Sequence, residues 1–96
     1  MALSNLSLQI LPIVPDNEVY SVVDEVISLI KASNLKYVVG PMETTIEGEL
    51  DVLLKIVKDA QTVCVKAGAE RVISIVKIDY KTGGVTIDEK TAKYSK

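Results

Sequence analysis

The spacing of hydrophobic residues switches between two periods along this chain, and the order of the switches restricts the possible fold most strongly. Residues 3–14 alternate in polarity, with Leu6, Leu8 and Ile10 on one side. This period of two is typical of a strand with one buried face. Residues 17–33 then carry valine and isoleucine at a period of 3.6, which predicts an amphipathic helix.

The same two patterns return in the second half of the chain. Residues 37–39 and 44–48 predict a hairpin around a Gly-Pro turn. Residues 49–67 predict a second helix, 71–80 a last strand, and a capping box opens a short helix over 86–94. The expected core stripe of the second helix is Leu50, Leu53, Leu54, Val57, Ala60, Cys64 and Ala67.

This order of elements is that of the α+β ferredoxin-like βαββαβ sandwich, with a short C-terminal helix added. Two helices cover one face of a four-stranded antiparallel sheet, and the first and third strands lie side by side in its centre. Ninety-six residues suffice for a single two-layer core. We therefore expect residues 1–96 to form one domain.

The second face of this sheet is expected to be polar at one end and apolar at the other. Leu11, Ile13, Ile73 and Ile75 would all lie on this face. Covering a few such side chains is worth several kcal/mol at roughly 25 cal/mol per Å². We therefore expect face-to-face association into a homo-oligomer.

Composition excludes several classes of function. The net charge of −2, from 11 basic and 13 acidic residues, includes no basic block of the kind that nucleic acid requires. The absence of histidine excludes imidazole metal sites and Ser-His or Cys-His nucleophile pairs, and we expect no metal site. The single Cys64, the lack of a signal-like N-terminus and the lack of a membrane-length apolar run predict a cytoplasmic protein without a membrane partner.

Two separated motifs resemble the YkoF-like thiamine-binding family, in particular its MTH-type single-domain branch. They are GPMETTIEGE at residues 40–49 and IDYKTGGVTIDEKTAKY at residues 78–94. In that family a Gly-Pro turn precedes a Thr-Thr-(Ile/Val)-Glu-Gly-Glu strand, and an Asp-Tyr-Lys-x-Gly-Gly run precedes Thr-Ile-x-Glu-Lys. The resemblance implies a ferredoxin-like subunit that forms dimers or tetramers through its sheets and binds thiamine or its hydroxymethylpyrimidine part.

The chemistry of thiamine directs attention to the same hairpin. The aminopyrimidine needs a carboxyl group with amide or hydroxyl partners, and the cationic thiazolium needs a counter-charge. Glu47 and its open-face neighbours offer the first set, and Glu43 offers the second. The predicted ligand-binding residues are Ser7, Gln9, Met42, Glu43, Thr44, Thr45 and Glu47.

One alternative remains open from the sequence, and a second is argued against by it. The polar residues of the sheet face could serve subunit packing alone, in a structural or regulatory homo-oligomer that binds another small effector. Acylphosphatase-like catalysis would need an arginine in the loop after the first strand, but residues 14–17 contain none and the only arginine is Arg71. We therefore expect no catalytic residues, no cofactor and no enzymatic activity.

Overall fold

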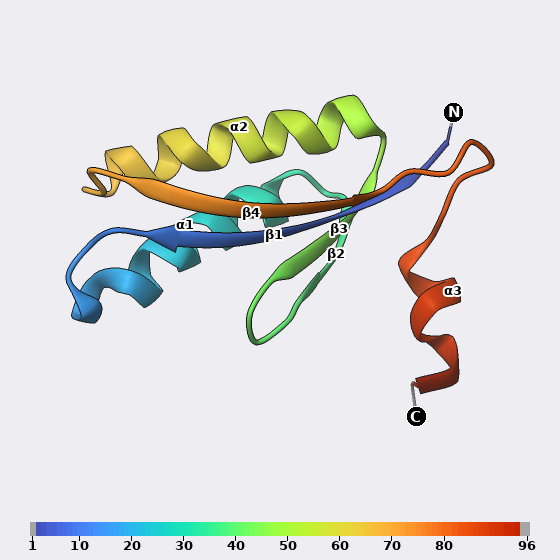
Figure 1. Ribbon diagram of the computed structural model, residues 1–96, viewed down its shortest axis with the longest axis horizontal. Coiled ribbons are helices and arrows are strands. Elements are labelled where there is room, and N and C mark those ends of the chain that lie inside the picture. The colour runs from blue at the N-terminus through green and yellow to red at the C-terminus, as the bar shows by residue number, and fades with distance from the viewer. Residues whose placement is uncertain (1, 95–96) are drawn as a thin grey trace.

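The computed structural model describes residues 2–94 and contains one four-stranded antiparallel sheet with two long helices on one of its faces (Figure 1). The strand order is β2-β3-β1-β4, which confirms the predicted ferredoxin-like sandwich. In chain order the elements are β1 (Ser4–Pro12), a 3-10 turn (Asp16–Glu18), α1 (Val19–Ala32), β2 (Lys36–Val39), β3 (Thr44–Gly48), α2 (Leu50–Lys66), β4 (Val72–Asp79), α3 (Ile87–Thr91) and a 3-10 turn (Ala92–Tyr94).

The core lies between the sheet and the pair α1 and α2. The alternation of β1 places Leu6, Leu8 and Ile10 against the helices, and all three are buried. The same face of β3 contributes Ile46, which is fully buried. Valine and isoleucine supply much of this core because the chain lacks phenylalanine and tryptophan. The valines and isoleucines of α1 that complete it are Val22, Val26 and Ile30.

The buried stripe of α2 differs from the one expected from the sequence. Leu54 was assigned to the core but is 44% exposed, whereas Ile56 is buried. The buried residues of the helix are Leu53, Ile56, Ala60 and Cys64, which follow an i, i+3, i+7, i+11 spacing. This helix has apolar residues on two sides, so its sequence is compatible with more than one buried face. Packing against the sheet determines which face is buried.

Residues with positive φ end both long helices. Asn34 follows α1 with φ of 61°, and Gly68 follows α2 with φ of 108°. Both positions were expected from the sequence, because asparagine and glycine tolerate the left-handed region. The start of α1 is later than expected, since Asp16–Glu18 forms a 3-10 turn before the helix begins at Val19.

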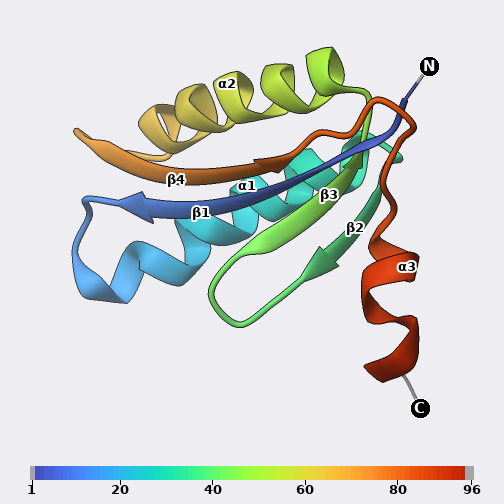
Figure 2. The same ribbon diagram turned by 45° about the vertical axis from the view of Figure 1, so that its right-hand side comes forward.

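The opposite face of the sheet, called here the open face, has neither α1 nor α2 on it. Figure 2 shows α3 well separated from those two helices and beside the β2 end of the sheet. Within residues 2–94, no helix is both long and apolar enough to cross a membrane. The position of α3 on the open face defines the candidate site.

Candidate functional site

One row of residues across all four strands holds the segment that leads into α3. Strand register places Lys36 opposite Glu47, Glu47 opposite Asn5, and Asn5 opposite Asp79. Directly opposed residues in antiparallel strands point to the same face. These four residues, called the anchor row, therefore lie side by side on the open face.

The two central members of the anchor row bind the backbone of the C-terminal segment. The Ile87 N–H donates to Glu47 Oε1 at 2.7 Å, and the Asn5 Nδ2 donates to the Val85 carbonyl at 3.4 Å. The side chains of Val85 and Ile87 are both buried. Apolar burial and backbone hydrogen bonds together attach this segment to the sheet.

The two outer members of the anchor row form ion pairs with α3. The Lys36 ammonium pairs with the Asp88 carboxylate, and Lys90 Nζ lies 2.6 Å from Asp79 Oδ2. The predicted capping box is also present, because the side chains and backbones of Thr86 and Glu89 satisfy each other at the start of α3. Local capping starts the helix, and the anchor row fixes its place on the sheet.

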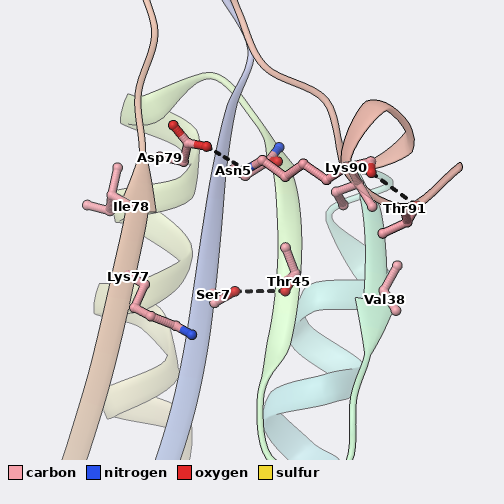
Figure 3. A pocket seen from close by; sticks show the side chains of 10 residues that line it. Asn5, Ser7, Val38, Thr45, Lys77, Ile78, Asp79, Lys90 and Thr91 are labelled. Carbon is pink, nitrogen blue, oxygen red and sulfur yellow. Dashed lines mark hydrogen bonds and ion pairs between the residues drawn. The ribbon is translucent and has the colours of Figure 1, made fainter. Parts of the chain in front are cut away.

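The next row of the sheet is the floor of a pocket of about 370 Å³. Register places Val38 opposite Thr45, Thr45 opposite Ser7, and Ser7 opposite Lys77. These four residues, called the floor row, all line the pocket. Figure 3 shows Lys77 pointing from β4 toward Ser7 on β1, with the Ser7 and Thr45 hydroxyls joined by a hydrogen bond.

A polar chain crosses the floor row from the turn of the hairpin. The Glu43 carboxylate lies 3.0 Å from Lys77 Nζ, and this lysine, with a smaller effect of the Ser7 hydroxyl, holds the pKa of Glu43 below its usual range. The Ser7 and Thr45 hydroxyls share a 2.7 Å hydrogen bond in which either can donate, and the remaining lone pairs of both oxygens can accept.

Asn5 contributes a buried acceptor at the anchor-row end of the pocket. Its side chain is 4% exposed, and its Oδ1 has no hydrogen-bond partner within the described residues. The Val85 carbonyl fixes the amide orientation, because only Nδ2 can donate to it. An unpaired buried oxygen is costly, and here it lies at a pocket.

The structure brings together only part of the ligand set expected from the sequence. Ser7 and Thr45 line the pocket, whereas one oxygen of Glu47 is engaged by Ile87 at its edge. The other four residues line a second groove of about 250 Å³, between the hairpin turn and α1. They are Gln9, Met42, Glu43 and Thr44.

Glu43 links the second groove to the pocket, because its carboxylate forms an ion pair with Lys77 on the floor row. Gln9 lies in the next row of the sheet, opposite Ile75. Thr44 faces the helices and is 7% exposed, opposite Leu8, and Met42 is 74% exposed at the turn.

Three charged pocket residues were missed from the sequence: Lys77, Asp79 and Lys90. The alternation of residues 71–80 places Lys77 and Asp79 on the same face as Ile73 and Ile75, so a signal for these two was available. Lys90 had no such signal, because nothing in a short helix specifies which surface it packs against. Among residues 2–94, no three His, Cys, Asp or Glu side chains gather into a metal site.

Comparison with known proteins identifies the family. The model of the family described as "Thiamine-binding protein" matches residues 6–95. The chain belongs to the thiamine-binding protein family. The resemblance drawn from the two sequence motifs is thereby confirmed, and the family is described by binding rather than by a reaction.

Relatives of the family match over nearly the whole chain. A UPF0045 protein of Clostridium perfringens is 62% identical over 90 residues, covering 94% of this chain and 95% of the relative. The solved DUF77 domain of Bacillus cereus is 52% identical with a TM-score of 0.93, covering 98% and 91%. A Thermotoga maritima structure, provisionally described as a thiamine biosynthesis/salvage protein, is 36% identical with a TM-score of 0.91, covering 97% and 99%.

Proposed function

We propose that this protein binds thiamine, or its hydroxymethylpyrimidine part, in the open-face pocket. The chain belongs to the thiamine-binding protein family. The observation that carries the proposal is its pocket of about 370 Å³, which is lined by the Ser7 and Thr45 hydroxyls and by three charged residues. This volume is within the ~300–1,000 Å³ of small-molecule sites. Because binding requires no catalytic group, we propose a binding protein without enzymatic activity. We also propose that it acts in the cytoplasm.

The hydrogen-bonding groups of the pocket suit an aminopyrimidine. The Thr45 hydroxyl, which shares a hydrogen bond with Ser7, has lone pairs that can accept from the exocyclic amino group. Lys77 supplies a donor for a ring nitrogen from the opposite side of the floor row. The apolar side of the ring packs against Val38, which is 48% exposed.

We further propose that a second copy of the chain completes the site. Beyond the floor row, the open face continues with the opposed pairs Gln9 and Ile75, then Leu11 and Ile73. The three apolar members of these pairs are 39–48% exposed. Contact with the same surface of another subunit would remove them from water and enclose the adjacent pocket.

Titration calorimetry with thiamine tests the proposal. The wild-type protein is expected to bind saturably, and Thr45→Val is expected to weaken binding by about twofold to tenfold, the cost of one neutral hydrogen bond. Thr62→Val, an exposed threonine of α2, is the matched control and should bind normally. The absence of saturable heat at millimolar thiamine would exclude the proposal.

One observation favours the alternative, a structural or regulatory homo-oligomer that binds another small effector. The two lysines of the pocket are each paired with a carboxylate, Lys77 with Glu43 and Lys90 with Asp79. A face neutralised in this way can pack against another subunit without a ligand. Oligomers that form fully and bind no thiamine would support this function.

A further inference from the structure

Lys90 reaches across one end of the pocket to pair with Asp79. Both residues line the pocket, with Lys90 Nζ 2.6 Å from Asp79 Oδ2. Figure 3 shows the lysine extending from α3 toward the carboxylate on β4. Building on the proposed function, we propose that Asp79 recognises the cationic ring of the ligand, and that Lys90 is an internal competitor which this ring displaces.

Asp79 is the carboxylate near the pocket that a ligand can most easily engage. Glu47 accepts from the backbone N–H of Ile87, which can leave only if the buried C-terminal segment detaches. Glu43 is held by Lys77 and by a serine hydroxyl, which lower its pKa. The partner of Asp79 is the tip of a flexible side chain, which can move without any change in the backbone.

The Lys90 and Asp79 pair is weak enough for a ligand to replace. Their side chains are 42% and 52% exposed, and ion pairs at such exposure contribute little to stability. The helix itself does not depend on this contact, because the Ile87 hydrogen bond and its buried side chain remain. Lys90 can therefore turn toward solvent while α3 stays docked.

Asn5 supplies a second group for the same end of the ligand. It lies directly opposite Asp79 in the sheet register and also lines the pocket. Its buried Oδ1 has no partner within the described residues. A ligand that replaces the Lys90 ammonium therefore meets the Asp79 carboxylate with the Asn5 side chain next to it.

The competition sets a preference for permanently charged ligands. A thiazolium and an ammonium cannot both occupy the short contact to one carboxylate without repelling each other. A neutral pyrimidine gains no attraction between opposite charges from Asp79 and need not displace Lys90. The pocket should therefore distinguish the cationic vitamin from its neutral pyrimidine fragment through these two residues.

Calorimetry of two variants with two ligands tests the inference. Lys90→Met should strengthen thiamine binding by about twofold to fivefold, because the competitor is gone. Asp79→Asn should weaken it about tenfold or more, because a charge-assisted contact is lost. The affinity for neutral 4-amino-5-hydroxymethyl-2-methylpyrimidine should change by less than about twofold in both.

The two variants break the same ion pair but should move the affinity in opposite directions, which a purely structural role would not do. Lys55→Met is the control, since it breaks an exposed 2.6 Å ion pair with Asp59 on α2. If the wild type binds thiamine but Lys90→Met has the same or a lower affinity for it, the inference is overturned. The proposed function is unaffected by that result. The absence of wild-type thiamine binding overturns both.

Discussion

Glu47 on β3 accepts a 2.7 Å hydrogen bond from the backbone N–H of Ile87, forty positions away in the chain. The glutamate of the Thr-Thr-Ile-Glu motif therefore fixes the start of α3 at the edge of the pocket. Its carboxylate connects the two motifs from which the family was first inferred. The hydrogen bond between Glu47 and Ile87 therefore places Ile87, a lining residue, at one edge of the pocket.

Removal of the Glu47 acceptor should loosen the C-terminal segment. Glu47→Ala leaves the N–H of Ile87, a buried residue, without its partner, which costs about 1–3 kcal/mol of unfolding free energy. Glu47→Gln keeps an oxygen acceptor and should lose less. Urea denaturation and amide hydrogen exchange at Ile87 measure the two effects, and equal behaviour of Ala, Gln and wild type would contradict the assigned role.

The buried side of α2 can be tested with a pair of residues on one helix. Ile56→Ala should cost about 2–5 kcal/mol of unfolding free energy, because it leaves a cavity against the sheet. Leu54→Ala, at a side chain that is 44% exposed, should cost much less. Thermal or chemical denaturation measures both losses of unfolding free energy. A larger loss for Leu54→Ala than for Ile56→Ala would support the buried face expected from the sequence.

The ion pair between Glu43 and Lys77 should make the stability depend on pH in the acidic range. The pKa of Glu43 is lower in the folded state, so its stabilising effect is complete above the ordinary glutamate pKa and is lost as the pH falls through the lowered folded value. Lys77→Met should bring the Glu43 pKa up toward its usual range. NMR titration of the Glu43 side chain measures the change, and an unaltered pKa would argue against the pair in solution.

Self-association through the open face should be sensitive to one apolar side chain on β4. Ile75→Lys places a charge at a position that is 48% exposed in the isolated chain, and it should shift the sedimentation profile toward single chains. Val65→Lys on α2, at a side chain that is 59% exposed, is the control. A wild-type protein that sediments as one chain at micromolar concentration would remove this surface as an interface.

The alternation of strands with period two and helices with period 3.6 was sufficient to predict the fold, and period-two alternation predicted half of the floor row. It placed Ser7 and Thr45 on the open face, and the ferredoxin-like order of strands made them neighbours, as their 2.7 Å hydrogen bond confirms. The capping box likewise predicted where α3 begins. These signals are local, so they can be read from short stretches of sequence.

The remaining features of the site depend on tertiary placement. A capping box determines where a helix starts but not which surface it covers, so the partners of Glu47 and Asp79 could not be derived from it. The buried stripe of α2 failed at Leu54 for a related reason, since packing chose between two apolar sides. Sequence patterns predicted the layers, and contacts between distant segments determined the site.

The anchor row makes the docking of α3 depend on the completeness of the sheet. Each strand supplies one of its four members, Lys36, Glu47, Asn5 and Asp79. A slip of one residue in any strand would send its member to the face covered by the helices. Only a sheet with every strand present and correctly aligned offers α3 all of its contacts, so the position of the C-terminal helix depends on the register of all four strands.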